Sequence, residues 1–333
     1  MSRKLEVAVF GATGAVGEQL LTALADSKLP IGTLHVYGGP ARSSRVDTVS
    51  FAAESLGVEP ITRLAEGRPN LAFLAVPAAV SARLAPGLAD RGCFVIDIGN
   101  VSGLDAPLAL PPTHGSLPDG AISALRCPSA AGWMLASLLA PLADAGVTSV
   151  TGVVTLSAAS RGRGAMDELA QQVVANFTQQ DPPRRIFPDG LAFDVLPEDG
   201  PQDEWSGAER QAAEEVEVLA GIPASRVGIQ LATLPLFSGS TCGLHLRGIS
   251  VEAAMDAWRD APALREVSRT EKLRPRAWLG RADIGWGRLR ADPGGDGVHV
   301  WLVADPLVGA GAATPVRAAG LAYAAGLLQG TEA

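Results

Sequence analysis

Residues 7–24 read VAVFGATGAVGEQLLTAL, and the predicted architecture of the chain starts from this stretch. The short run Leu5–Phe10 is apolar, rich in valine and too short for a buried helix, so it predicts a buried parallel strand. Three glycines follow at a spacing of three, and leucines then recur at helical spacing. A strand, a glycine turn and a helix in this order present backbone N–H groups to a diphosphate.

The glycine turn is therefore the candidate dinucleotide site. Gly11 permits a tight turn, Gly14 leaves out a Cβ where the phosphates would lie, and Gly17 permits close packing of helix against strand. The alternative is a glycine-rich turn in some other α/β protein. The candidate cofactor-binding residues of the turn are Gly11, Ala12, Thr13, Gly14, Ala15, Val16 and Gly17.

The residues after the second predicted strand bear on the choice of cofactor. This strand, Leu34–Tyr37, ends without the acidic residue that holds the ribose 2′-hydroxyl in NAD-binding folds. Arg42 and Ser43 follow instead, and a guanidinium beside a hydroxyl suits a 2′-phosphate. The sequence thus favours NADP over NAD, and the alternative is a solvated basic loop.

Composition narrows the classes of partner and location. A formal net charge of -8 argues against nucleic acid or an anionic membrane as the main partner. No apolar run is long enough to span a bilayer, and a cleaved leader would remove the glycine turn, so a cytoplasmic location is expected. Three widely spaced cysteines fit a reducing compartment. Four scattered histidines show no metal-binding spacing, so no metal site is expected.

The pattern of strands and helices divides the chain. Alternation over about the first 125 residues predicts an α/β Rossmann-type domain with a parallel sheet at residues 1–128. Longer strands with β-branched residues then predict an α+β dimerisation or substrate domain with a largely antiparallel sheet at residues 129–311. A helix of small residues at 312–333 is expected to return to the first domain.

A second junction of strand and helix carries the candidate nucleophiles. The sequence Arg126–Gly132 reads RCPSAAG and separates a short predicted strand from a helix. Such a junction aims backbone donors at a cleft, where a nucleophile is useful. Cys127 and Ser129 are the candidates, and a small core residue is the plainer interpretation of a cysteine here.

The chain resembles the aspartate-β-semialdehyde dehydrogenases along nearly its whole length, and most closely their Usg-like paralogue branch. The opening GATGAVGEQLL, the segment Phe193–Pro197, the strand Leu234–Phe237 and Asp305 before a small-residue helix are similar to family segments in the same order. The resemblance implies a homodimer that reduces a β-aspartyl phosphate with NADPH. In the family, a cysteine thiolate forms a thioacyl intermediate and a histidine serves as acid and base.

Matched residue by residue to the family, the catalytic groups are mostly missing. Aligning the prolines of the nucleophile turn places Ala130 at the nucleophile, while shifts of one or three residues place Ser129 or Cys127 there. The family's histidine matches Ser240, and its orienting glutamine matches Ser157. Two arginines that hold anions in the family match Thr233 and Gly103.

Two positive side chains, Arg161 and Arg210, remain as candidates to hold a small-molecule anion. The matches predict a Usg-like pseudoenzyme with an NADP-type Rossmann domain that does not run the thioacyl reaction. The alternative is an active NADP-dependent semialdehyde dehydrogenase of amino-acid biosynthesis that uses Cys127 or Ser129. A third class is a scaffold protein without a ligand, against which the glycine turn argues.

Overall fold

The computed structural model describes residues 4–39, 48–61, 69–117, 122–200, 204–268 and 271–328. The chain divides into two compact units. Unit 1 consists of Met1–Pro128 together with Ala310–Ala333, and unit 2 is the continuous segment Ser129–Gly309.

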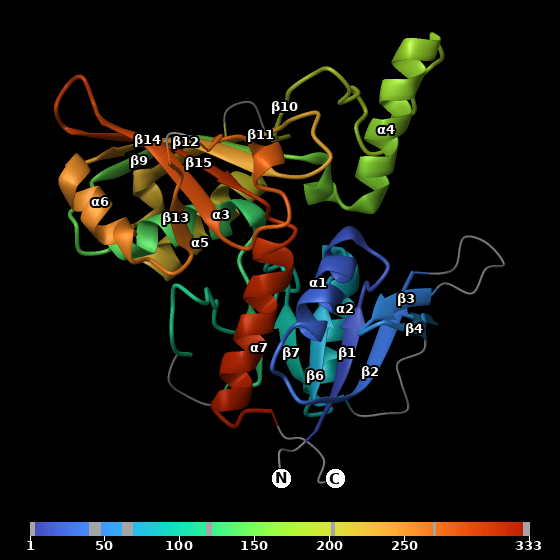
Figure 1. Cartoon of the computed structure of the whole chain (residues 1–333). Helices are drawn as coiled ribbons and strands as arrows, with labels where there is room; N and C mark the ends of the chain where they lie inside the picture. The colour runs from blue at the N-terminus through green and yellow to red at the C-terminus, as the bar shows by residue number, and fades with distance from the viewer. Residues whose placement is uncertain are drawn as a thin grey trace. The chain divides into compact units, whose positions relative to one another are not determined.

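Unit 1 is built on a parallel sheet with the strand order β5–β2–β1–β6–β7–β8 (Figure 1). The strands are β1 (Leu5–Phe10), β2 (Ile31–Gly38), β5 (Glu59–Pro60), β6 (Leu71–Leu74), β7 (Phe94–Asp97) and β8 (Ala124–Arg126). A hairpin of β3 (Thr48–Phe51) and β4 (Glu54–Gly57) stands apart from this sheet. The strand order is that of a dinucleotide-binding fold, which confirms the Rossmann-type prediction.

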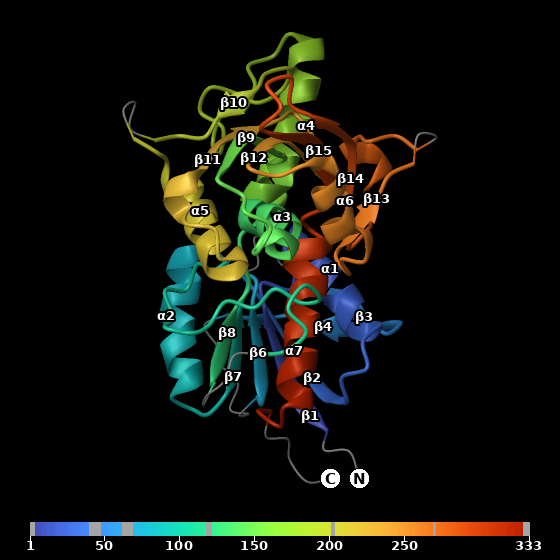
Figure 2. The same ribbon diagram turned by 90° about the vertical axis from the view of Figure 1, so that its left-hand side faces the viewer.

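Helices cover both faces of this sheet, which is why its central strands are continuous apolar runs. The helices are α1 (Ala15–Ala25), α2 (Ala78–Ala89) and α7 (Thr314–Ala324). Val7 and Val9 of β1 face the core formed with α1 and α7, whereas Ala8 and Phe10 face the core formed with α2. Figure 2 shows α2 on one side of the sheet and α7 on the other.

Unit 2 is built on a sheet with the order β10–β11–β9–β12–β15–β14–β13. The strands are β9 (Ser149–Leu156), β10 (Leu196–Pro197), β11 (Val227–Thr233), β12 (Ser240–Arg247), β13 (Leu264–Glu266), β14 (Ile284–Ala291) and β15 (Gly297–Ala304). The prediction of a largely antiparallel sheet holds in part: β10–β11, β9–β12, β12–β15 and β14–β15 are antiparallel, whereas β9–β11 and β13–β14 are parallel, so the sheet is mixed. Parallel neighbours need a long crossover, and the chain from β9 to β11 makes one through two helices.

The helices of unit 2 are α3 (Ala130–Leu139), α4 (Arg163–Thr178), α5 (Gly207–Ala220) and α6 (Val251–Arg259). In α3 every residue from Ala131 to Leu139 is buried, as in a helix that is apolar all round. Helix α3 gives way to a 3₁₀ turn that contains Pro141, which lacks an N–H donor. Helix α4 packs with residues 186–196 in a small core of its own.

Among the described residues, the helices are too short or too polar to cross a membrane.

Candidate active site

The predicted glycine turn lies between β1 and α1, at the point where the strand order of unit 1 reverses. Gly11 has a φ of +90°, and an added Cβ would collide with the carbonyl oxygen of Ala75. An added Cβ on Gly17 would collide with the carbonyl oxygen of Gly11. Close packing of backbone therefore requires glycine at two of the three positions.

The first turn of α1 presents backbone donors at its open end. Gly14 is the N-cap and makes no side-chain hydrogen bond, while its own N–H donates to the Gly11 carbonyl oxygen at 2.9 Å. The N–H groups of Ala15, Val16 and Gly17 belong to the first turn, which has no acceptor within the helix. Free donors and the positive end of the helix dipole suit a diphosphate.

Two of the other predicted cofactor residues, Ala12 and Thr13, lie in the glycine turn. Ala12 is completely buried and its N–H donates to the Tyr37 carbonyl oxygen at 3.0 Å, so it holds the turn in place. Thr13 is half-buried in the same turn. Arg42 and Ser43 lie outside the described residues, and their contact with a 2′-phosphate stays a prediction.

A buried carboxyl group shapes the turn after β7. Asp97 accepts hydrogen bonds from the N–H and the hydroxyl of Ser102, both at 2.8 Å. Burial raises the pKa of Asp97, and the hydrogen bonds from Ser102 oppose that change. Gly103, which matches an anion-holding arginine of the family, follows with a φ of +72°.

Cys127 follows β8 and belongs to the core of unit 1. Its side chain is completely buried, and its N–H donates to the Asp97 carbonyl oxygen at 2.8 Å. Burial and, less strongly, the charge of Asp97 raise the pKa of the Cys127 thiol far above its usual range. A sulfur in this environment stays a thiol near neutral pH, whereas a cysteine nucleophile has to be a thiolate.

Ser129 is the N-cap of α3 and is tied to a buried carboxylate. Its hydroxyl donates to Oε2 of Glu215 at 2.7 Å and accepts from the N–H of Gly132 at 3.1 Å. The Ser129 N–H also donates to the same carboxylate, at 3.1 and 3.0 Å from its two oxygens. Gln211 donates to Oε1 of Glu215 at 2.9 Å. The hydroxyl is therefore occupied both as donor and as acceptor.

Glycine is required at position 132 for this arrangement, because an added Cβ would collide with Oε2 of Glu215. Glu215 was assigned no role from the sequence. Its side chain is 1% exposed and shares the buried face of α5 with Ala212 and Leu219. A glutamate that shares the helical spacing of the apolar residues indicates a buried carboxyl group, and this pattern could have identified Glu215 from the sequence.

The remaining candidates have ordinary surroundings. Ala130 begins α3 and offers only a methyl group, and Ser240 begins β12 and is 1% exposed.

The two candidate anion-binding arginines are both paired with carboxylates. Arg161 lies 3.6 Å from Glu198, and Arg210 lies 3.6 Å from Glu204. The Arg161 guanidinium also stacks over the Phe187 ring, 5.4 Å from its centroid.

Comparison with known proteins covers most of the chain. Residues 6–116 match the NAD binding domain of semialdehyde dehydrogenases, and residues 139–309 match their dimerisation domain. The USG-1 protein homolog of Pseudomonas aeruginosa is 30% identical over 92% of this chain and 94% of its own. Aspartate-semialdehyde dehydrogenase of Legionella pneumophila is 29% identical over 92% of each chain.

A solved structure shares the fold. The crystal structure of aspartate semialdehyde dehydrogenase II from Vibrio cholerae, complexed with ASA, has a TM-score of 0.86 and 24% sequence identity. The similarity covers 97% of this chain and 99% of that one.

Replacing Ser129 by alanine should lower the stability of unit 2. The change removes a helix cap and a hydrogen bond to a charged group, so the free energy of unfolding should fall by about 1.5–3 kcal/mol. Ser137→Ala is the matched control, because Ser137 lies in the same helix with a buried hydroxyl that has no hydrogen-bond partner among the described residues. That control should be neutral or stabilising. Urea unfolding measures both, and equal losses in the two variants would contradict this account.

Proposed function

This chain belongs to the semialdehyde dehydrogenase family, and we propose that it is an NADP(H)-binding homodimer that does not run the thioacyl reaction. The proposal concerns a Usg-like member that keeps the nucleotide-binding turn and has replaced the groups that act on the acyl substrate. The lost activity would be the interconversion of aspartate semialdehyde and β-aspartyl phosphate.

The state of the junction at residues 127–130 carries the proposal. A thioacyl intermediate needs a sulfur that is ionised and accessible, and the Cys127 sulfur is neither. At the position matched to the nucleophile, Ala130 has no reactive atom. Where the resemblance places the acid and base, Ser240 offers only a buried hydroxyl, which unlike an imidazole does not titrate near neutral pH.

One observation favours a second candidate function. The Ser129 hydroxyl lies 2.7 Å from a carboxylate, which is the spacing of a nucleophile and its base. The alternative is thus an active dehydrogenase with a serine nucleophile. Against it, the same hydroxyl accepts from the Gly132 N–H and begins α3, so the contact has a structural role already.

We expect phosphate-dependent oxidation of aspartate semialdehyde with NADP to stay at background, measured as absorbance of NADPH. Nucleophilic and acid–base groups contribute about 10²–10⁴-fold each, so their joint absence should remove turnover. Iodoacetamide should label Cys127 slowly in the folded protein. Ala130→Cys should also stay inactive, because Ser157 and Ser240 still replace the orienting glutamine and the acid–base histidine of the family. Robust turnover that vanishes in Cys127→Ser or in Ser129→Ala would establish the active alternative.

NADPH should bind more tightly than NADH, because the sequence after Tyr37 continues with Arg42 and Ser43 and lacks the acidic residue that binds a ribose hydroxyl in NAD-binding folds. Arg42→Ala should weaken NADPH binding about 10- to 100-fold and leave NADH binding unchanged, since only NADPH carries the 2′-phosphate. Arg91→Ala, at an exposed arginine of unit 1, is the control. Calorimetric titration tests the preference, which would be refuted by equal affinities for the two nucleotides in the unmodified protein.

The open face of the unit 2 sheet supports the homodimer. Helices α3, α5 and α6 pack against strands of this sheet, while Val153 and Trp301 are 41% and 38% exposed. These two residues flank Gly243 in one row across β9, β12 and β15, so they share a face. An exposed apolar row within a segment that matches a dimerisation domain suits a two-fold interface.

Light scattering at micromolar concentration should therefore report a dimer. Trp301→Lys should shift the mass toward the monomer, because it places a charge in the centre of the proposed interface. Met255→Lys is the matched control, since Met255 is 37% exposed and lies on α6, which packs against β13 and β14. A monomer in the unmodified protein, or the same shift in both variants, would count against this interface.

A further inference from the structure

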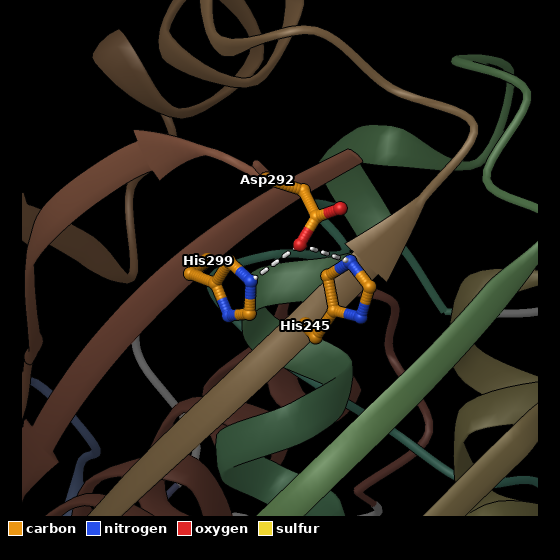
Figure 3. Close-up of side chains that lie close together, drawn as sticks. All are labelled: His245, Asp292 and His299. Atoms are coloured by element: carbon orange, nitrogen blue, oxygen red, sulfur yellow. Dashed lines mark hydrogen bonds and ion pairs between the residues drawn. The ribbon is translucent and has the colours of Figure 1, made fainter. Parts of the chain in front are cut away.

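Two histidines and an aspartate converge on the open face of the unit 2 sheet (Figure 3). His245 in β12 and His299 in β15 are register partners, so their side chains leave the sheet on the same face. Their rings are stacked, with centroids 4.5 Å apart and planes 9° from parallel. Asp292 follows β14 and reaches over both rings.

The three side chains direct their ligand atoms toward one point. Oδ1 of Asp292 lies 2.8 Å from Nε2 of His299 and 3.5 Å from Nε2 of His245. One ligand atom from each of the three side chains lies within 4.8 Å of the other two. Within one chain the side chains are 23–31% exposed, so solvent reaches the cluster without fully hydrating it. The cluster lies on the same face as Val153 and Trp301, so the proposed dimer would place it beside the interface.

One nitrogen of this cluster makes no hydrogen bond within the described part of the chain, although it lies 3.5 Å from Oδ1 of Asp292. Only His299 makes a hydrogen bond to the carboxylate, whereas Nε2 of His245 is buried and has no hydrogen-bond partner among the described residues. A buried polar atom without a partner costs stability and calls for an explanation. A cation between the three side chains would satisfy all of the ligand atoms at once.

We propose that His245, Asp292 and His299 bind one borderline divalent transition-metal ion of the Zn²⁺, Co²⁺ or Ni²⁺ class. Two imidazole nitrogens with one carboxylate oxygen suit these ions, whereas Mg²⁺ and Ca²⁺ take oxygen ligands. With bonds of about 2.0–2.2 Å, neighbouring ligand atoms lie roughly 2.9–3.5 Å apart. The two N···O distances of 2.8 and 3.5 Å already come close to this range, so binding requires mainly a tilt of the stacked rings.

The carboxylate is held for this role by its own turn. Oδ2 of Asp292 accepts from the N–H of Gly294 at 3.0 Å, and the Asp292 N–H donates to the Gly297 carbonyl oxygen at 2.8 Å. Such outer contacts orient a metal ligand. Arg290, the register partner of His299 on β14, places a positive charge on the same strand pair and should moderate the affinity.

The site would join three segments of the sheet. A bound ion would tie β12 to β15 and to the turn after β14, and water or another ligand would complete its coordination. This inference does not depend on the proposed cofactor or on the fate of the thioacyl reaction.

The test is calorimetric titration of the full chain, without a histidine tag and after treatment with a chelator, with ZnCl₂. We expect one ion per chain with a dissociation constant in the micromolar range. Loss of an outer contact to a metal ligand costs about 10- to 100-fold in affinity, so His245→Ala, His299→Ala and Asp292→Asn should each weaken binding at least about tenfold. Absence of saturable binding below about 100 μM would overturn the proposal.

Two controls separate this site from other sources of binding. His35→Ala removes a single histidine–carboxylate pair, His35 with Glu6 at 3.0 Å, and should leave the affinity unchanged. Co²⁺ should give visible d–d bands without sulfur charge-transfer absorption, because the ligands are nitrogen and oxygen; sulfur bands would assign the ion to a cysteine and overturn the proposal.

If an alanine variant fails to fold, as judged by circular dichroism, the nearly isosteric Asp292→Asn decides. Equal binding in Asp292→Asn and the unmodified protein would contradict the site.

Discussion

A buried carboxylate fixes the centre of unit 2. Glu215 is 1% exposed, and a carboxyl group so far from water needs hydrogen-bond partners. Its partners include the N–H and hydroxyl of Ser129 and the amide of Gln211, so the carboxyl group joins α5 to the first turn of α3. Since α3 is apolar on every side, the position of its first turn sets how the sheet packs over it. The same hydrogen bond engages the hydroxyl of Ser129, the residue next to Ala130.

The proposed loss of the thioacyl reaction agrees with the way in which the polar groups near Ser129 are hydrogen-bonded. Nucleophiles and bases are kept in strained or poorly satisfied environments, which cost stability and which selection maintains only for function. At the junction of β8 and α3, the polar group of Ser129 is satisfied in each of its roles, and the Cys127 sulfur is packed as an apolar side chain. The contacts of this junction are those of a folded core, which supports the proposed loss of the thioacyl reaction.

Local patterns predicted local structure well. The bounds of β1 were predicted to the residue, the glycine turn has the required backbone geometry, and the family resemblance is confirmed. The parallel pairing of β11 with β9 was not predicted. The direction of β11 depends on the path of a connection of about seventy residues, and the hydrophobic periodicity of a strand carries no information about that path. Glu215 acts on a residue 86 positions away, and His245 meets His299 only through the register of two strands. The predicted roles of Arg42 and Ser43 stay predictions.

The order of the segments has a consequence for synthesis on the ribosome. Unit 1 takes α7 from the C-terminal end of the chain, after the whole of unit 2. The apolar face that carries Val7 and Val9 therefore leaves the ribosome before Ala318 and Ala319, which cover part of it, have been translated. At about 5–20 residues per second, the intervening unit takes roughly 10–40 s to make. During that interval α7 is absent, so part of the face that carries Val7 and Val9 stays uncovered and offers apolar surface to a chaperone.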